Sequence, residues 1–408
     1  QQHSGKRQPN VTNGKNQPKK DKSYINTAAA LKIKKVYELA LKNGAPVIGI
    51  FDSKGGDIKE GMKTLGAYGE IAKMSAALSG AVPQIAVVDG LCAGTAAMIA
   101  CMADVVIMTE KSELFMTAPF TADDKTAGAG TAENAAKSGV AAILAKDSDE
   151  AIAKAKQLLS VLPANNLETA GNDYYMENDA AVSADLKGIE LISSVADKES
   201  VIELYKQFGT SAVTAIGSLN WRTAGFVATN NGAKLTADDS AKIARFVTLC
   251  DAYSIPVVTF VDSEGFEKSS AAELAGSIRD SAKLAQAYAS ATTAKIAVVT
   301  GKAYGSAYVA LASTAAGSDF TFAWEGAVIA PTTPEAAVVF LNGVSEDNAK
   351  QAQEYADNEA DAFTAAANGY VDRVITAEDT KSALTSAIEA TSSKRVVTPA
   401  KKHVNFVY

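Results

Sequence analysis

The sequence has 408 residues, 47% of them hydrophobic and 21% charged, which is the balance of a globular protein too long for one ordinary core. Its only two histidines, His3 and His403, lie near the termini, so a mechanism with a core histidine base is disfavoured. The three cysteines show no CxxC or Cys/His spacing, so we expect buried reduced thiols and no metal site.

The chain begins with a polar, basic segment, predicted as a tail over residues 1–26. Residues 1–22 carry six lysines or arginines against one aspartate, but no interleaved aromatic residue. We therefore expect a solvated tail and no nucleic-acid partner. The segment has no signal-peptide core, and the longest apolar run, residues 91–103, is too short to cross a membrane. We expect a cytoplasmic protein without membrane insertion.

Helices and apolar strands alternate along the next part of the chain. Apolar spacings of three and four predict a helix over residues 27–42, and residues 47–51 form an apolar strand that ends at Asp-Ser-x-Gly. A second helix leads to a strand at residues 85–88. This strand opens into the small-residue turn Ala93-Gly94-Thr95-Ala96. Such alternation predicts an α/β fold with parallel strands.

The second half of the chain repeats this order. Residues 31–56 align with residues 241–266 at an offset of 210, and Pro46 falls on Pro256. A second small-residue turn, Tyr304-Gly305-Ser306-Ala307, follows the first at an offset of 211. We predict a duplicated domain, with copies at residues 27–165 and 191–408 joined by a polar linker at 166–190.

The two turns are candidate oxyanion sites. Backbone N–H groups at a helix N-terminus lack intrahelical partners, and small residues let a ligand approach them closely. This chemistry needs no histidine. The alternative is that the small residues only allow the helix to pack tightly on the sheet. Neither turn fits GxGxxG or GxxxxGK[ST], so a dinucleotide or P-loop site is set aside.

Several motifs together resemble one known family: GAPVIGIFDSKGG, SGAVPQIAVVDGLCAGTAAM, KAYGSAYVAL and NGYVDRVI. They are similar to the carboxyltransferase subunits of biotin-dependent acyl-CoA carboxylases and decarboxylases. This group includes the β subunits of acetyl- and propionyl-CoA carboxylase and the carboxyltransferase of glutaconyl-CoA decarboxylase. The resemblance runs from about Ala28 to Lys402. It implies two tandem crotonase-like (ClpP/crotonase) β/β/α spiral domains, the first for acyl-CoA and the second for biotin.

The resemblance also assigns roles to residues. The backbone N–H groups of Gly94 and Thr95 would hold the thioester oxygen while the acyl group becomes an enolate. Those of Ser306 and Ala307, with Gly305 shaping the turn, would hold the ureido oxygen of biotin. Positions expected to face CoA or biotin are Lys54, Gly55, Gly56, Lys59, Ala93, Tyr304 and Tyr308, and Val309 is expected to influence the choice of acyl chain.

The resemblance implies partners as well. The sequence has no biotin-attachment Met-Lys-Met and no region large enough to carboxylate biotin. Biotin is therefore expected on a separate carrier protein, served by a biotin carboxylase or a decarboxylase partner subunit. The active site is expected between two copies of the chain, in a homo-oligomer from dimer to hexamer. The acyl group and the direction of transfer stay open.

One departure keeps alternatives open. The second half contains FGTSAVTAIGSLNWRTAGFVATN (residues 208–230), whereas only residues 1–26 precede the first helix, so the first domain is predicted to be shortened. A catalytically degenerate scaffold that binds CoA is one alternative. A peptidase that uses Ser306 with Lys295 or Lys302 is another.

Two pairs of residues carry smaller expectations. Asp52 and Asp262 end equivalent strands, where they could cap turns or line the cleft, and their repeated placement favours the turn role. Trp221 and Trp324 are predicted to anchor strands in the core.

Overall fold

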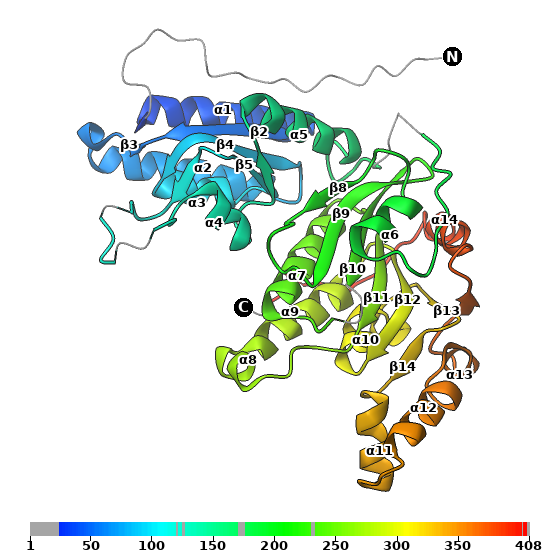
Figure 1. Cartoon of the computed structure of the whole chain (residues 1–408). Helices are drawn as coiled ribbons and strands as arrows, with labels where there is room; N and C mark the ends of the chain where they lie inside the picture. The colour runs from blue at the N-terminus through cyan, green and yellow to red at the C-terminus, as the bar shows by residue number, and fades with distance from the viewer. Residues whose placement is uncertain are drawn as a thin grey trace, which may run out of the picture. The chain divides into compact units, whose positions relative to one another are not determined.

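A computed structural model of the chain describes residues 24–119, 121–124, 127–169, 176–229, 233–401 and 403–405. The chain divides into two compact units, residues 1–169 and residues 170–408 (Figure 1). The predicted basic tail lies outside the described residues except for its last three positions. Residues 170–175 of the predicted linker lie outside them too.

The first unit contains a parallel sheet in the order β2-β4-β5-β7, with β6 beside β4 and a separate pair β1-β3. Its elements are β1 (Tyr24–Ile25), α1 (Thr27–Asn43), β2 (Val47–Ser53), β3 (Gly55–Gly56), the 3₁₀ helix η1 (Ile58–Glu60), α2 (Met62–Leu78), β4 (Gln84–Ala93), α3 (Thr95–Cys101), β5 (Val105–Thr109), β6 (Glu113–Phe115), α4 (Ala132–Lys137), β7 (Ile143–Ala145) and α5 (Ser148–Val161).

Helix α1 is bounded by sequence signals at both ends. The Asn26 side chain accepts a hydrogen bond from Ala29 N at 2.9 Å, which satisfies one of the first-turn donors. The helix ends at Gly44, whose φ of 60° is the left-handed conformation that glycine adopts without strain. The predicted helix over 27–42 is therefore confirmed.

The second unit contains an eight-stranded sheet in the order β15-β13-β12-β11-β10-β9-β8, with β14 beside β12. Its elements are α6 (Gly188–Val195), β8 (Ile202–Leu204), β9 (Ala212–Leu219), β10 (Arg222–Thr229), α7 (Ala237–Ala252), β11 (Val257–Ser263), α8 (Ser270–Ala275), α9 (Ser277–Ser290), β12 (Lys295–Tyr304), α10 (Ser306–Leu311), η2 (Thr314–Ala316), β13 (Phe320–Trp324), β14 (Val328–Ala330), α11 (Pro334–Asn342), α12 (Asn348–Asn358), α13 (Ala362–Ala367), β15 (Arg373–Ile375) and α14 (Thr380–Ala390).

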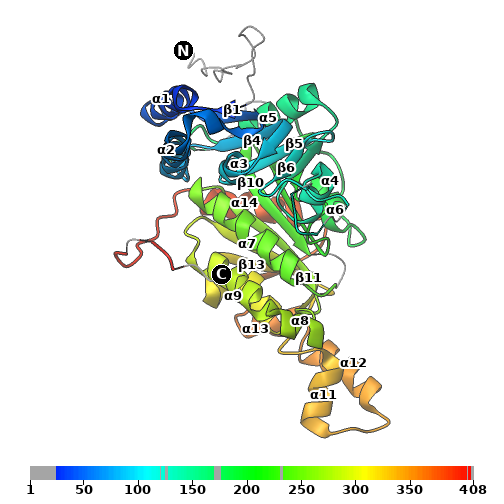
Figure 2. The same cartoon turned by 90° about the vertical axis from the view of Figure 1, so that its left-hand side faces the viewer.

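The strands of the second unit mix two kinds of pairing. Strands β8, β9 and β10 are antiparallel neighbours, whereas β10 to β15 pair in parallel. Helices α6 and α14 supply core residues on one face of this sheet, and α7 and α9 lie on the other (Figure 2). Helices α11 and α12 pack on each other and project away from the sheet in both views.

The same irregularity occurs at the end of the central strand pair in each unit. The register shifts between Phe51↔Val88 and Ser53↔Cys92 in the first unit, and between Val261↔Val299 and Ser263↔Ala303 in the second. In each pair the second strand carries two extra residues, which is a bulge. The carboxylates of Asp52 and Asp262 accept hydrogen bonds from Leu91 N (3.3 Å) and Lys302 N (2.9 Å) across it. The predicted turn role of both aspartates is confirmed.

Two expectations about burial are wrong. Trp324 is buried and its Nε1 donates to Thr380 Oγ1 at 2.9 Å, but Trp221 is 58% exposed. Trp221 stands in the tight turn between β9 and β10, where its φ of 73° follows from turn geometry, not from packing. Cys92 and Cys250 are buried as expected, whereas Cys101, in the last turn of α3, is exposed.

Within the described ranges, no helix is both long and apolar enough to span a bilayer. Over the same ranges, no group of three or more His, Cys, Asp or Glu side chains has an arrangement suited to a metal ion.

Candidate active site

The two small-residue turns have the same backbone conformation. Gly94 connects β4 to α3 with φ 61° and ψ −131°, and Gly305 connects β12 to α10 with φ 55° and ψ −131°. Only glycine reaches this region without strain, because a Cβ atom would collide with the flanking peptide groups. The duplicated sequence therefore builds one strand–turn–helix geometry twice.

The glycine N–H groups themselves are used by the sheet. Gly94 N donates to Phe115 O at 2.8 Å, and Gly305 N donates to Ala330 O at 2.9 Å. The expectation that the Gly94 N–H would hold a thioester oxygen is therefore wrong, because the carbonyl at the end of β6 already accepts it. Thr95 N is the first donor of the turn beyond the sheet.

The next N–H groups are the ones left for a ligand. Helix α3 makes its first intrahelical bond from Met98 N to Gly94 O, and α10 makes its first from Val309 N to Gly305 O. The N–H groups that precede Met98 and Val309 in the two helices receive no capping side-chain oxygen, because each cap residue is a glycine. In both described turns this leaves three N–H groups without an intrahelical acceptor, and the first two of them belong to Thr95 and Ala96 in the first unit and to Ser306 and Ala307 in the second.

The pattern of buried and exposed side chains at the two turns is also similar. Thr95 is half-buried and Ser306 is exposed, whereas Ala96 and Ala307 are buried beneath them. One turn further along each helix stands an exposed apolar side chain, Met98 or Val309. Sequence reasoning did not single out Ala96 or Met98, although the offset of 211 residues that pairs the turns points to both.

A serine-anchored loop lies beside each turn. Ser53 Oγ accepts a hydrogen bond from Gly55 N at 3.2 Å, and Ser263 Oγ accepts one from Gly265 N at 3.2 Å. A Cβ atom added to Gly55 would stand 3.9 Å from Ala93 O, the carbonyl just before the first turn. The structure thus brings Gly55 of the predicted 54–56 loop next to Ala93.

Gly56 and the lysines of this loop have different constraints. A Cβ atom on Gly56 would lie 2.3 Å from Thr64 Cγ2, so α2 packs against a bare backbone there. Lys54 and Lys59 are exposed. Lys59 N donates to Asp57 Oδ1 at 3.0 Å, which fixes the start of η1. The loop therefore presents two solvated ammonium groups on a fixed backbone.

Three side chains near the turns have restricted chemistry. Burial raises the pKa of the Cys92 thiol to about 12, so it is not a nucleophile at neutral pH. Burial likewise raises the pKa of Tyr308 to about 12, and its hydroxyl donates to Tyr370 O at 2.7 Å. Tyr304 is buried in a small cluster with Ala330.

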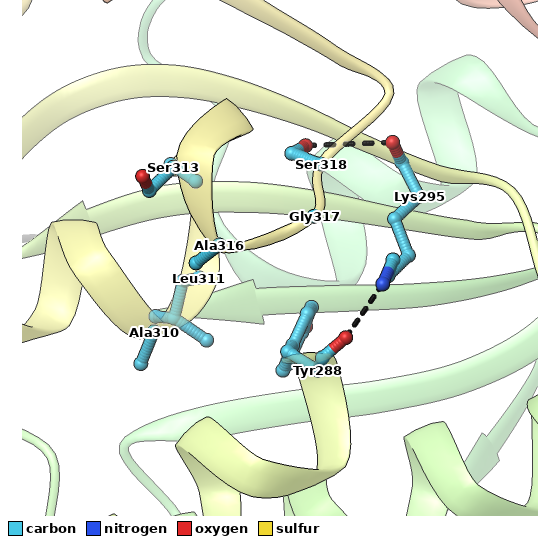
Figure 3. Close-up of a pocket in the computed structure, with 9 residues that line it drawn as sticks. Tyr288, Lys295, Ala310, Leu311, Ser313, Ala316, Gly317 and Ser318 are labelled. Atoms are coloured by element: carbon cyan, nitrogen blue, oxygen red, sulfur yellow. Dashed lines mark hydrogen bonds between the residues drawn. The ribbon is translucent and has the colours of Figure 1, made fainter. Parts of the chain in front are cut away.

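The geometry disfavours a Ser/Lys peptidase. Lys295 Nζ donates to Tyr288 O at 2.6 Å, near the C-terminal end of α9 (Figure 3). It also donates to Ala291 O at 2.7 Å. Lys295 begins β12 and Ser306 follows its end, so the two residues lie at opposite ends of a ten-residue strand. The other candidate base, Lys302, is ion-paired with Glu264 at 2.8 Å.

Comparison with known proteins agrees with this geometry. The chain matches the carboxyl transferase domain family over residues 13–406. It is 36% identical to the methylmalonyl-CoA carboxyltransferase 12S subunit of Propionibacterium freudenreichii subsp. shermanii, over 92% of this chain and 77% of that one. It is 35% identical to the propionyl-CoA carboxylase beta chain of Cereibacter sphaeroides, over 92% and 79%.

A solved structure gives the same answer. The crystal structure of transcarboxylase 12S, described as a hexamer with hydrolysed methylmalonyl-coenzyme A bound, superposes with a TM-score of 0.88 at 34% identity. The match covers 94% of this chain and 80% of that one.

The chain belongs to the carboxyl transferase domain family. The predicted crotonase-like α/β fold and the predicted class, a biotin-dependent acyl-CoA carboxyltransferase, are confirmed. A catalytically degenerate subunit finds no support.

Proposed function

We propose that the chain moves a carboxyl group between biotin and the propionyl-CoA/methylmalonyl-CoA pair. Three relatives at 35–36% identity support this substrate, because their names describe a methylmalonyl-CoA carboxyltransferase, a propionyl-CoA carboxylase and a methylmalonyl-CoA decarboxylase. Propionyl-CoA and methylmalonyl-CoA differ by one carboxyl group. The observation that carries the mechanism is the matched pair of turns, each with N–H groups at a helix start that have no intrahelical acceptor.

In this proposal the first turn holds the acyl-CoA. Thr95 N and Ala96 N donate to the thioester oxygen, which gains negative charge when the α-carbon becomes an enolate. Donors fixed in place before the reaction stabilise that charge without reorganisation, and each is worth about 10²–10³ in rate. The exposed ammonium groups of Lys54 and Lys59 are suited to the phosphates of CoA. Gly55 lets the ligand pass close to the backbone, whereas Gly56 holds the loop against α2.

The second turn fits biotin by its donor set. Ser306 N and Ala307 N are suited to a carbonyl oxygen, and the exposed Val309 offers an apolar surface beside them. Biotin, when bound, supplies the carboxyl group on its ureido ring. Ser306 and Ala307 would hold the ureido oxygen, Gly305 keeps the turn open, and the ring of Tyr308 flanks the site from the same helix. We further propose that Val309 contacts the acyl chain and thereby influences its choice.

The assembly is proposed from the same family. Biotin would arrive on a carrier protein, loaded by a biotin carboxylase or unloaded by a decarboxylase partner subunit. The acyl site of one copy would face the biotin site of another, in a dimer or a larger ring. The exposed apolar side chains beside the two turns, Met98 and Val309, are consistent with surfaces that meet a second copy.

The test is carboxyl transfer by the purified chain. Methylmalonyl-CoA, malonyl-CoA and glutaconyl-CoA are each incubated with free biotin, and the acyl-CoA products are separated and quantified. We expect biotin-dependent conversion of methylmalonyl-CoA to propionyl-CoA at the highest kcat/KM. Faster turnover of another substrate would refute the proposed acyl group. If the folded protein converted none of the three substrates, the proposal that this chain alone catalyses the transfer would be refuted.

A further inference from the structure

Two exposed methionines flank the turn of the first unit. Met98 stands on α3 three residues after Thr95, which puts both residues on one face of the helix, and helical side chains lean toward the N-terminus. Met116 follows Phe115, whose carbonyl oxygen accepts the N–H of Gly94 at 2.8 Å. Met98 is 46% exposed and Met116 is 62% exposed. Two flexible apolar side chains therefore border the peptide groups of this turn.

The turn of the second unit has stiff residues at the same two places. Val309 is the counterpart of Met98 at the offset of 211, and it is 54% exposed. Pro331 is the counterpart of Met116, because it follows the residue whose carbonyl oxygen accepts the N–H of Gly305 at 2.9 Å. Valine is branched at Cβ and proline is a closed ring, so neither side chain adapts its shape as a methionine does.

The space beside the two turns differs in the same sense. A Cβ atom added to Gly305 would lie 3.0 Å from the carbonyl oxygen of Pro331. One added to Gly94 would meet no heavy atom of the described residues within 4 Å beyond its chain neighbours. The first turn is therefore open where the second is closed. Methionine has an unbranched chain and a polarisable sulfur, and it fills gaps of irregular shape.

We infer that Met98 and Met116 are adaptable walls of the acyl pocket, and that the chain binds a series of short acyl groups there with similar affinity. The inference rests on the proposed function, in which the first turn holds the thioester oxygen of the acyl-CoA. The acyl group is bonded to the same carbonyl carbon, so it lies within reach of the side chains that border this turn. Biotin is the same molecule in every reaction, and the stiff residues at the second turn suit a ligand of constant shape.

The experiment measures the binding of acetyl-CoA, propionyl-CoA and butyryl-CoA to the full chain by isothermal titration calorimetry. A well-defined apolar pocket separates ligands that differ by one methylene by about 10–200-fold. We expect the parent chain to separate neighbouring members of this series by less than about tenfold in Kd. Met98→Ile and Met116→Ile keep a similar volume but add a branch at Cβ. Each is expected to widen the separation between propionyl-CoA and butyryl-CoA by about fivefold or more.

The matched control is Met176→Ile, which changes an exposed methionine of the second unit and is expected to leave all three Kd values as they are. Oxidation by dilute hydrogen peroxide gives a second readout that needs no substitution, because an exposed thioether is oxidised to the sulfoxide. With saturating propionyl-CoA, mass spectrometry of the parent chain should show oxidation of Met98 and Met116 slowed by about threefold or more. The rate at Met176 should be the same with and without the ligand.

The outcomes separate this inference from the proposed function. A separation of about tenfold or more in the parent chain, or unchanged oxidation of both methionines at saturation, would overturn the inference even if carboxyl transfer were observed. Similar affinity for the three ligands, with both methionines protected but no carboxyl transfer, would refute the proposed function and support the two methionines as acyl contacts. If Met98→Ile changed the KM for biotin and left the acyl-CoA Kd values as they are, a biotin contact would replace the inferred acyl contact.

Discussion

The two units agree at their turns and differ at the sheet edge beside them. The turn glycines have ψ −131° in both, and the bulges and their aspartates repeat as well. Strand β11, however, is buried throughout, whereas β2 is half-exposed over most of its length. The turn depends on residues a few positions apart and survives duplication intact. Burial of the edge depends on a hairpin that precedes the helix, and the described part of the first unit lacks it.

The largest expected effect comes from removing a donor that both units share. Thr95 and Ser306 each occupy the first helical position, where proline fits the backbone but carries no N–H. We expect Thr95→Pro and Ser306→Pro each to lower kcat for carboxyl transfer by about 10²–10³ if both turns are oxyanion sites. Steady-state kinetics with methylmalonyl-CoA and biotin measure this.

The matched controls are Thr95→Ala and Ser306→Ala, which keep the N–H and remove only the hydroxyl. They are expected to stay within a few-fold of the parent chain. If Ser306→Ala were as inactive as Ser306→Pro, the hydroxyl and not the backbone would carry the chemistry. Circular dichroism and the Tm of each variant separate catalytic loss from unfolding.

The second effect probes the difference between the units. Burial lowers the pKa of Lys242 to about 8, so its ammonium is largely present at neutral pH, held by three carbonyls. Lys242→Met leaves these carbonyls without their donor, and we expect a loss of about 3 kcal/mol in the free energy of unfolding. Lys32→Met removes an exposed ammonium and is expected to change it by less than about 0.5 kcal/mol.

Urea denaturation followed by circular dichroism checks both values. A chain of two compact units is not assumed to unfold in a single two-state step, so each transition that is resolved is fitted on its own. Equal losses of unfolding free energy in the two variants would contradict the comparison. They would mean that Lys32, like Lys242, is held by buried carbonyl groups.

Much of the similarity between the two units was predictable from the sequence. The features that were not predictable depend on contacts between residues far apart in the chain or on the exact place of a turn. The offsets of 210 and 211 predicted the duplicated strands and turns, because apolar periodicity and glycine spacing are local. The use of Gly94 N by Phe115 O was not predictable, because the pairing of β6 with β4 joins segments about twenty residues apart. Trp221 was misplaced because a large aromatic residue in a strand-rich segment predicts burial, whereas here it forms a turn.

The third effect separates backbone conformation from steric space at the turns. A Cβ atom on Gly94 would meet nothing within 4 Å, whereas one on Gly305 would lie 3.0 Å from Pro331 O. Both alanine variants carry the strain of a positive φ, about 1–3 kcal/mol, but Gly305→Ala adds a clash with a backbone oxygen. We expect Gly305→Ala to lower the Tm of its unit more than Gly94→Ala does. Equal shifts in differential scanning calorimetry would show that conformational strain alone sets the cost.

The smallest effect concerns a hydrogen bond that the turn of the second unit makes and the turn of the first unit does not. Tyr308 follows Ser306 and its hydroxyl donates to Tyr370 O, whereas the equivalent position in the first unit is Ala97. Tyr308→Phe removes this hydrogen bond and is expected to cost about 1 kcal/mol at pH 7. Because burial raises the pKa of Tyr308 to about 12, the folded chain keeps the proton that the unfolded chain releases near pH 10.

The stability that this hydroxyl supplies is therefore complete below pH 10 and is lost as the pH rises from 10 to 12. The difference in the free energy of unfolding between the parent chain and Tyr308→Phe should shrink over that range and stay constant from pH 6 to 9. Parallel urea titrations of the two proteins give this difference directly, because every other titrating group contributes equally to both. A difference that grew above pH 10 would mean that the folded state favours the phenolate, and the hydroxyl would then not be held by Tyr370 O.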